Sequence, residues 1–297
     1  MKISILTPTY NRANTLPNLY ASLIKNSEYG VELEWLIMDD GSVDNTKGVI
    51  EEFVKENKIQ IKYFSQNNSG KMAALNNIVN KATGELIIEC DSDDYLTKSA
   101  VKYIKEKYES IEKKDDLYAL VFLKYNEKMN NIGSNFKDEN IKTTMFDLYY
   151  KAGLEGDKAL VFFADKRKQF SYVVEKDEKF STEARMHHKM DKQYKVICCN
   201  KPIMICEYRN DGYSKNIKEV FMNNPYAHYH YFKEMFEFDM SGVLFKKRLY
   251  IIKHYILFCN LLGKKHILKD VKGIANKLLT ILLYIPGNIK TNMYKKS

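Results

Sequence analysis

Residues 86–94 read Leu86-Ile87-Ile88-Glu89-Cys90-Asp91-Ser92-Asp93-Asp94, a short apolar run followed by three carboxylates. The apolar run predicts a short buried strand. Carboxylates crowded at the end of such a strand repel one another unless a cation joins them, and Mg²⁺ or Mn²⁺ accepts oxygen ligands of this kind. The alternative is a helix N-cap, with Asp93 or Asp94 capping a segment that starts near Thr97. The stretch taken alone favours neither interpretation.

The chain before this stretch alternates apolar strands with helical spacing. Strands are predicted at residues 3–6, 33–38, 59–64 and 86–88, and helices at 13–25, after Asp44 or Asn45, and at 70–79. This order predicts an α/β fold with a mostly parallel sheet and right-handed crossovers. Ligands of such sheets bind beyond the carboxyl ends of the strands. The polar clusters 7–12, 39–44, 67–71 and 91–94 all follow predicted strands, so we expect them to share one crevice.

The rest of the chain is predicted to complete the sheet and then become helical. Further strands are expected at 118–125, 160–163, 195–198 and 203–208, with a helix over 182–192 and a helical region from about residue 217. A hydrophobic share of 45% and a charged share of 29% describe an ordinary globular protein rather than a disordered one. At 297 residues, the chain has room for one large domain or two modest ones.

Cysteine usage and the start of the chain predict a cytoplasmic protein. The five cysteines are odd in number and show neither a CxxC spacing nor histidines at zinc-binding distances. We therefore expect reduced thiols that mostly fill the core. Residues 1–6 run directly into a strand without a signal peptide, and no apolar run approaches the 18–20 residues or so that span a bilayer.

The net charge of +9 is concentrated near the C-terminus. Residues 241–297 hold twelve Lys/Arg and one acid, Asp270, a net charge of +11, which leaves −2 for residues 1–240. Residues 245–252 and 278–285 interleave basic and apolar side chains, a pattern typical of helices that bind membrane surfaces. A helical subdomain packed on the core with solvated lysines outside explains the pattern equally well. Nucleic-acid binding is not expected, because no recognition motif is present and an acidic crevice repels phosphates.

Four of these segments together resemble the family 2 glycosyltransferases. The resemblance rests on 4–12 (SILTPTYNR), 39–44 (DDGSVD), 68–71 (NSGK) with Ala74 and Asn76, and 91–94 (DSDD), in the family's order and spacing. A weaker match continues to Ser214 through 207–212 (EYRNDG). The resemblance implies a GT-A fold, which is a Rossmann-like α/β sheet flanked by helices. It also implies a catalytic domain over 1–215, with a nucleotide-sugar-binding half at 1–100 and an acceptor-side half at 101–215, followed by a basic helical region at 216–297.

The resemblance assigns the first clusters to a nucleotide-sugar donor. A carboxylate at Asp40 can accept the imide N–H of uracil or the N1–H of guanine, although the Asp-Asp-Gly-Ser run also suits a plain turn. Gly70 precedes a helix start, where anions are favoured. Arg12 and Lys71 are the cations placed for base, ribose or phosphate, and the alternative for each is a solvated surface charge. The expected wall of the base and ribose site consists of Thr7, Pro8, Thr9 and Tyr10.

The aspartate cluster is expected to bind the diphosphate through a divalent metal, Mn²⁺ or Mg²⁺. Asp93 is the expected direct ligand. Asp91 is expected to meet the ribose hydroxyls and to support the metal's water shell, and the adjacent Ser92 is expected to contact the nucleotide-sugar. Asp94 is expected to support the cluster or to cap the following helix. Such a metal neutralises the charge that develops on the departing diphosphate.

Glu183 is the expected general base that accepts the proton of the acceptor hydroxyl. The family often has Glu-Asp or Asp-Asp here, whereas this chain has Glu183-Ala184. The alternative is an acid in the turn that starts the 182–192 helix. A turn at the floor of the site is expected from Glu207, Arg209 and Asp211. His187 and His188 are expected on a helix surface, and the alternative is that either reaches the diphosphate or the metal. The acceptor-side candidates are Asp157, Lys158 and His187.

These residues predict an enzyme that transfers one sugar, a hexose or N-acetylhexosamine, to a hydroxyl of a glycan or lipid-linked acceptor in surface polysaccharide synthesis. A UDP-sugar is the favoured donor, and a single base with one metal favours inversion by single displacement. The protein is expected at the inner face of the plasma membrane as a peripheral protein. The alternatives are a sugar nucleotidyltransferase, which usually has a glycine in its first loop that 7–12 lacks, and a non-catalytic subunit that binds nucleotide-sugars.

Overall fold

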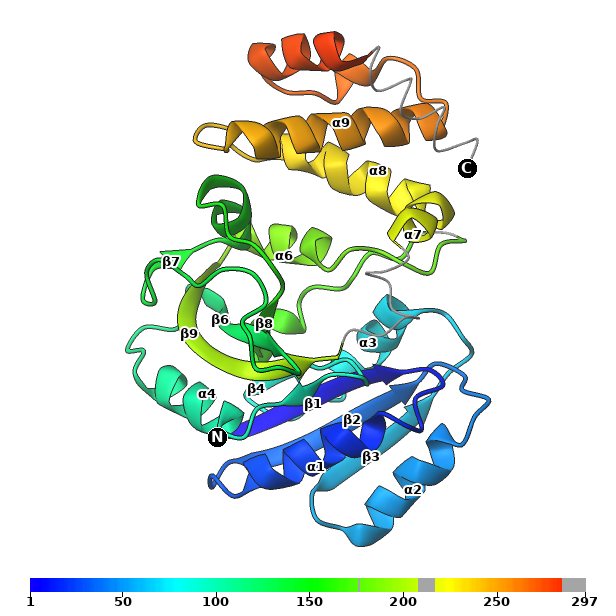
Figure 1. Cartoon of the computed structure of the whole chain (residues 1–297), viewed down its shortest axis with the longest axis vertical. Coiled ribbons are helices and arrows are strands. Elements are labelled where there is room, and N and C mark those ends of the chain that lie inside the picture. The colour runs from blue at the N-terminus through cyan, green and yellow to red at the C-terminus, as the bar shows by residue number, and fades with distance from the viewer. Residues whose placement is uncertain (176, 208–216, 285–297) are drawn as a thin grey trace. The chain divides into compact units, whose positions relative to one another are not determined.

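The computed structural model describes residues 1–175, 177–207 and 217–284 (Figure 1). The chain divides into two compact units that alternate along the sequence. The first unit comprises Met1–Met145, Leu154–Tyr172 and Met186–Asn210. The second comprises Phe146–Gly153, Val173–Arg185 and Asp211–Ser297. The two units are therefore described one after the other.

The first unit is built on a nine-stranded sheet, and its N-terminal half is parallel as predicted. Strand β1 (Lys2–Thr9) pairs in parallel with β2 (Glu32–Asp39) and with β4 (Leu86–Glu89), and β2 pairs with β3 (Gln60–Ser65). The crossover helices are α1 (Leu16–Ser27), α2 (Thr46–Glu56) and α3 (Lys71–Val79). The helix predicted from residue 13 begins at Leu16, because residues 11–15 form the loop that leaves β1.

The remaining strands make the sheet mixed rather than mostly parallel. Its order is β3-β2-β1-β4-β8-β6-β9-β5, with β7 also paired to β9. Strand β8 (Lys158–Phe163) runs antiparallel to both β4 and β6 (Leu117–Asn126), whereas β6 and β9 (Lys195–Cys206) are parallel. The short strands β5 (Tyr95–Leu96) and β7 (Lys142–Thr143) run antiparallel to β9. The alternation of strands and helices that predicts parallel pairing stops after β4.

A single long strand, β9, replaces the two strands predicted at 195–198 and 203–208. The polar residues Asn200 and Lys201 interrupt the apolar pattern and suggest a break. The strand continues across them as an irregularity: β6 pairs with β9 on both sides, but the register shifts from Cys199 to Pro202 and leaves Asn200 and Lys201 without a partner in β6. Strand β7 pairs with the first half of β9 and β5 with the second. Figure 1 shows β9 as a strongly curved strand. Residue 208 lies outside the described residues.

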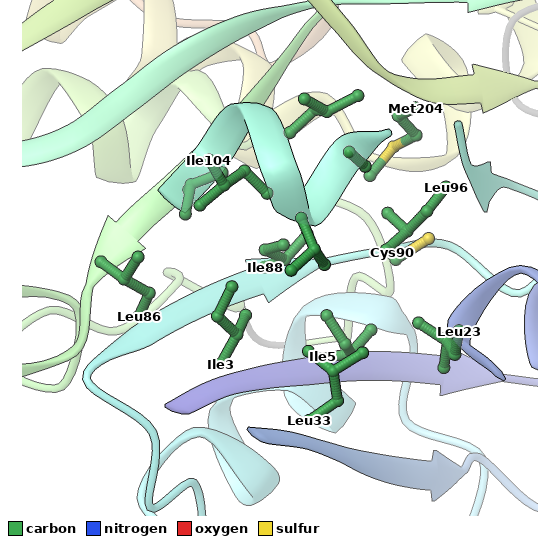
Figure 2. Close-up of a cluster of buried hydrophobic side chains, with 14 of the residues drawn as sticks. Ile3, Ile5, Leu23, Leu33, Leu86, Ile88, Cys90, Leu96, Ile104 and Met204 are labelled. Atoms are coloured by element: carbon green, nitrogen blue, oxygen red, sulfur yellow. The ribbon is translucent and has the colours of Figure 1, made fainter. Parts of the chain in front are cut away.

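The core of the first unit lies between the sheet and helices α1 and α4 (Ala100–Glu109). Branched side chains from β1 and β4 stack there, with Ile3, Ile5 and Ile88 fully buried (Figure 2). Trp35 stacks with Tyr20 and Phe53, so α1 and α2 are held against the same part of β2. Burial of several such side chains, about 1.5–3 kcal/mol each, fixes the strand ends that carry the polar clusters.

The second unit is helical, as predicted for the chain from about residue 217. Its helices are α7 (Ile217–Asn223), α8 (Pro225–Glu234) and α9 (Phe245–Leu261), and residues 274–284 are also helical. Phe232, Phe236 and Phe258 are among the buried side chains of its core. The short helices η2 (Met235–Glu237) and η3 (Ile267–Lys269) connect these elements. Residue 285 of the basic segment at 278–285 lies outside the described residues.

Three further observations complete the fold. Along the chain, η1 (Asp147–Lys151) and α5 (Ala164–Arg167) flank β8, and α6 (Ala184–Asp191) precedes β9 and agrees with the helix predicted at 182–192. All five cysteines are unpaired and four are buried, in agreement with the expectation that they mostly fill the core. Within the described part of the chain, none of the helices is both long and apolar enough to cross a bilayer.

Candidate active site

The loops that follow β1 and β2 are bound to each other in the first unit. The Asn11 backbone N–H donates to Ser42 Oγ at 2.9 Å, and the Val43 N–H donates to Asn11 Oδ1 at 2.9 Å. Asn11 has a φ of 54°, a left-handed conformation that asparagine tolerates better than most residues. The predicted clusters 7–12 and 39–44 therefore form one edge of a site, as the parallel sheet led us to expect.

Asp40 organises the loop that enters α3. Its Oδ1 accepts hydrogen bonds from Gln66 Nε2 at 2.8 Å and Ser69 N at 2.7 Å, and its Oδ2 accepts one from Gly70 N at 2.8 Å. Gly70 has a φ of 91°, which favours glycine over any other residue. The Asp-Asp-Gly-Ser turn itself is closed by Asp39, whose Oδ1 accepts a hydrogen bond from the Ser42 N–H at 2.8 Å, whereas Asp40 holds the loop before α3. Each carboxylate oxygen has two lone pairs, so Asp40 Oδ2 keeps the capacity to accept a ligand N–H.

The threonines of β1 differ in what their hydroxyls contact. Thr7 is fully buried and its Oγ1 accepts a hydrogen bond from Trp35 Nε1 at 2.9 Å, which places Thr7 in the core. Thr9 Oγ1 is buried and has no hydrogen-bond partner among the described residues. An unsatisfied buried hydroxyl costs about 1–3 kcal/mol, a cost that a bound polar ligand removes. Pro8 is buried beside it, and Tyr10 is exposed.

Lys71 pairs with the aspartate cluster instead of facing solvent. Its Nζ lies 2.7 Å from Asp91 Oδ2. Burial alone raises the pKa of Asp91, but the positive charges of Lys71, Lys124 and Arg12 outweigh burial and lower it. Arg12 therefore also acts on this cluster, although it comes from a different strand end. The interpretation of Lys71 as a solvated surface charge is wrong.

Asp93 differs from Asp91 and Asp94 because it forms no ion pair among the described residues, whereas those two pair with Lys71 and Lys124. Burial and the neighbouring Asp91 raise its pKa, and no cation forms an ion pair with it within residues 1–175, 177–207 and 217–284. A divalent cation beside Asp93 lowers this electrostatic cost, so the oxygen donors present fit Mg²⁺ or Mn²⁺. No group of three or more metal-binding side chains occurs in those same ranges. The fit is to an ion that takes one or two carboxylates and completes its shell with phosphate and water.

Asp94 is not a helix cap, which corrects one of the two initial interpretations of the cluster. Residues 95–96 form β5, and α4 begins only at Ala100 after Ser99. Asp94 is buried, accepts a hydrogen bond from Cys206 Sγ at 3.1 Å and lies 3.5 Å from Lys124 Nζ. Burial raises the pKa of Asp94 to about 6, with Lys124 opposing the shift and Asp91 adding to it.

Lys124 is the member of this cluster that the sequence did not indicate. It follows an apolar run in β6 and matches no motif, so a lysine at the end of a buried strand is its only sequence signal. Burial lowers the pKa of Lys124, but the charges of Asp94, Asp91 and Asp157 outweigh burial and raise it. Lys124 stays protonated and links the aspartate cluster electrostatically to Asp157.

The acceptor-side candidates have different surroundings. Asp157 is exposed, and its charge acts on Lys124. Lys158 is buried, and its Nζ donates to the backbone oxygens of Glu155 at 2.8 Å and Ile132 at 3.0 Å. This ammonium therefore joins two loops, and burial lowers its pKa to about 8. His187 packs against the ring of Phe162.

His188 corrects a further expectation, because it is buried in α6 and does not lie on the helix surface. Burial and the adjacent His187 lower the pKa of His188 to about 3, so it is neutral at physiological pH. Glu207 directly follows β9. Its predicted turn partners Arg209 and Asp211, and the rest of the 208–212 motif, lie outside the described residues.

In the second unit, the segment that carries Glu183 is bound to α8 by several polar contacts. Glu183 immediately precedes Ala184, the first residue of α6. Glu178 accepts hydrogen bonds from the backbone N–H groups of Tyr226 and Ala227, both at 2.7 Å, at the N-terminus of α8. Asn224 Oδ1 accepts from the N–H of Lys179 and of Phe180. The backbone before Glu183 is therefore held at several points.

Comparison with known proteins connects these residues to a family. The family model described as "Glycosyl transferase family 2" matches residues 4–167, which is more than half of the chain. An uncharacterized glycosyltransferase of Mycoplasma genitalium is 36% identical over 119 residues, 37% of this chain and 40% of that protein. The GalNAc(5)-diNAcBac-PP-undecaprenol β-1,3-glucosyltransferase of Campylobacter jejuni is 31% identical over 144 residues, 48% of this chain and 44% of that protein. The matched stretches span less than half of these curated relatives.

Solved structures resemble the fold over nearly the whole chain. Staphylococcus aureus TarS 1–349 in complex with UDP-GlcNAc has a TM-score of 0.60 at 18% identity, covering 100% of this chain and 92% of that one. The mannosyltransferase PcManGT of Pyrobaculum calidifontis, in complex with GDP-Man and Mn²⁺, has a TM-score of 0.55 at 14% identity, covering 99% and 84%. At these identities the likeness concerns the fold, and it confirms the predicted GT-A architecture.

Proposed function

The chain belongs to glycosyl transferase family 2, and on this premise we propose that it transfers one sugar from a nucleotide-sugar to an acceptor hydroxyl. The favoured donor is a UDP-sugar of a hexose or N-acetylhexosamine. The proposed acceptor is a glycan or a lipid-linked glycan of a bacterial surface polysaccharide. The names of similar proteins support this choice, since TarS is a poly(ribitol-phosphate) β-N-acetylglucosaminyltransferase and the C. jejuni relative is named for an undecaprenol-linked glycan.

The observation that carries the proposal is the grouping of charges from the segments that follow β1, β3 and β4. Lys71 and Arg12 provide positive charge beside Asp91, and Asp93 provides a carboxylate that forms no ion pair among the described residues. A diphosphate with a divalent cation matches both parts of this arrangement. The cation would bind the carboxylate, and the phosphate oxygens would bind the basic side chains.

The base and ribose of the donor are proposed to bind along the end of β1. The hydroxyl of Thr9, which lacks a partner in the described structure, is the polar group that a ligand there would satisfy. Asp40 Oδ2 would accept a hydrogen bond from an imide N–H of the base, and the exposed ring of Tyr10 would cover the base. Thr7 and Pro8 support this wall from the core, while Gly70, Asp91 and Ser92 meet the ribose and phosphates.

The proposed cofactor is Mn²⁺ or Mg²⁺. Asp93 would hold it directly, and Asp91 would support its water shell. When bound, such an ion neutralises charge on the departing nucleoside diphosphate. Lys71 and Arg12 add to this stabilisation because they already lie within electrostatic range of both aspartates.

Glu183 is proposed as the general base. The acceptor oxygen attacks the anomeric carbon while its proton passes to the Glu183 carboxylate, and the bond from that carbon to the diphosphate oxygen breaks on the opposite face. Single displacement of this kind inverts the anomeric configuration. Asp157 and His187 are proposed to face the acceptor, and Lys158 to hold the adjoining loop.

We also propose that the reaction takes place at the cytoplasmic face of the plasma membrane, where lipid-linked acceptors are available. The decisive experiment is incubation of the purified protein with Mn²⁺ and a panel of UDP- and GDP-sugars. Slow release of nucleoside diphosphate from one donor supports the proposal. Donor binding by calorimetry without release, even when acceptors are added, indicates a non-catalytic subunit. Formation of a nucleotide-sugar from a sugar phosphate and a nucleoside triphosphate indicates a nucleotidyltransferase.

A further inference from the structure

The helix formed by residues 274–284 has apolar side chains on two opposite faces. Leu279 and Leu283 pack against the core of the second unit, next to the buried residues of α9. Asn276 and Thr280 on the same face are buried. This face has the i, i+3, i+4, i+7 spacing of a helix that packs on a protein core. Figure 1 shows the helix lying alongside α9.

The opposite face of this helix is apolar and exposed. Ile274 is 81% exposed, Leu278 56%, Ile281 55% and Leu282 73%. Their spacing of i, i+4, i+7 and i+8 places these four side chains on one stripe, which we call the outer stripe. Single exposed apolar side chains are common, but a contiguous stripe of four aliphatic side chains indicates an interaction site.

Exposed lysines accompany the outer stripe. Lys265, Lys269, Lys272 and Lys277 lie in the helix or in the residues just before it, and all four are exposed. Residues 241–297 have a net charge of +11 with one acid, Asp270. That acid is already used within the second unit, because Asp270 binds Lys233 at 3.0 Å and Tyr229 at 2.9 Å. The surroundings of the stripe are therefore strongly positive.

We infer that the outer stripe inserts into the interfacial region of an anionic lipid bilayer. An aliphatic stripe bordered by lysines is complementary to acyl chains below a layer of negative headgroups. A second copy of the chain fits less well, because pairing two such segments brings like charges together. The inference specifies the membrane partner of the proposed function at residue level, and it is testable without donor or acceptor.

The test is co-sedimentation of the full chain with vesicles of phosphatidylcholine alone and of phosphatidylcholine mixed with phosphatidylglycerol. We expect binding to the mixed vesicles and little binding to the neutral ones. Leu278→Ser combined with Leu282→Ser removes apolar area without changing charge, and should weaken binding about tenfold or more. Lys272→Gln combined with Lys277→Gln should weaken binding to the anionic vesicles about fivefold per lysine and leave binding to the neutral vesicles unchanged. High salt should abolish the difference between this variant and the parent protein.

The matched control is Val54→Ser combined with Ile141→Ser, which removes two exposed apolar side chains from the first unit and should leave vesicle binding unchanged. Thermal unfolding of every variant separates lost binding from lost folding. Equal binding of the control and the Leu278/Leu282 variant overturns the inference. A change from oligomer to monomer in that variant, without vesicle binding by the parent protein, assigns the stripe to a second copy instead. If the variants still hydrolyse the donor, a failed vesicle experiment counts against membrane binding by the outer stripe and not against the proposed sugar transfer.

Discussion

Arg185 and Glu234 form a two-pronged ion pair in the second unit. Arg185 Nε lies 3.2 Å from one carboxylate oxygen of Glu234, and Nη2 lies 2.6 Å from the other. Nη1 of the same guanidinium donates to Glu175 at 2.8 Å, and the arginine is only 4% exposed. Arg185 follows Glu183 by two residues, so this pair connects the segment of the proposed base to the end of α8.

We predict that Arg185→Lys lowers turnover about tenfold or more while donor affinity changes less than twofold. Lysine keeps the charge but loses the planar fork that binds both carboxylates, which frees the backbone around Glu183. Measurement of kcat alongside calorimetric donor binding checks this prediction. The control is Glu106→Gln, which breaks an exposed pair with Lys102 on α4 and should alter neither value. An equal loss of donor affinity in Arg185→Lys would contradict the assignment.

Glu183→Gln should retain donor binding and lose turnover by a factor of roughly 10²–10⁴, the usual contribution of a general base. The amide has nearly the same shape but does not accept a proton, so the donor site in the first unit is unaffected. Single-turnover kinetics with a saturating donor measure the effect. Turnover at the parental rate would remove Glu183 as the base.

Asp93→Asn should abolish the metal-dependent part of donor binding, because it removes the carboxylate of the cluster that forms no ion pair among the described residues and whose pKa burial and Asp91 raise. Donor titrations with Mn²⁺ and with a chelator measure this part directly. Asp116→Asn is a suitable control, since Asp116 is an exposed acid that pairs with Lys142. If Mn²⁺ improves donor binding equally in the parent protein, in Asp93→Asn and in Asp116→Asn, the metal is held elsewhere.

Lys124→Met should shift the acidic limb of the kcat/KM profile to higher pH. Asp94 titrates near pH 6 because burial raises its pKa and Lys124 opposes that shift, so removing Lys124 raises the pKa further. Asp94 then becomes neutral at a higher pH, by about one unit or more for a single close charge. Initial rates from pH 5 to 8 check the shift. An unchanged limb would show that Asp94 does not limit activity.

The raised pKa of Asp94 also makes folding stability depend on pH, in the direction opposite to that of an acid whose pKa a salt bridge lowers. The folded-state pKa of Asp94 lies above its usual value near 3.8, so between about pH 4 and pH 6 the folded protein holds a proton that the unfolded chain releases. This single group therefore favours folding more as the pH falls through that window. The effect is confined to Asp94 and is superimposed on the titration of other acids.

Glu34→Gln should destabilise the protein by about 3 kcal/mol at pH 7 and by much less near pH 2. Burial disfavours the Glu34 carboxylate, but hydrogen bonds from Lys62, Ser4 and the Thr83 backbone outweigh burial and lower its pKa to about 2. A lowered pKa stabilises the fold above the unfolded value near 4.5, and this stability is lost as the pH falls through the folded value. Urea unfolding of both proteins at pH 7, 4 and 3 measures the difference. A constant difference across that range would contradict the assigned ionisation.

Local patterns in the sequence predicted the parallel half of the sheet and the position of the aspartate cluster. Apolar spacing distinguishes strands from helices up to β4, and the carboxyl ends of parallel strands meet at one edge, so segments 7–12, 39–44, 67–71 and 91–94 could be grouped without coordinates. The same local patterns failed where pairing partners decide the outcome. Asn200 and Lys201 look like a break, yet β9 continues past them because β6 pairs with it on both sides of a register shift at these two residues.

The sequence by itself determined the family, the order of the first elements and the residues at the strand ends, because these depend on neighbours along the chain. Only the tertiary structure decided which charges meet. Lys124 and Cys206 come from distant strands to the buried carboxylate of Asp94, and Arg185 reaches Glu234 from another segment. The energy of a buried charge depends on its solvent exposure and on the charges within a few ångströms. Both the solvent exposure and the neighbouring charges are set when the chain folds, and they cannot be read from the spacing of residues along the sequence.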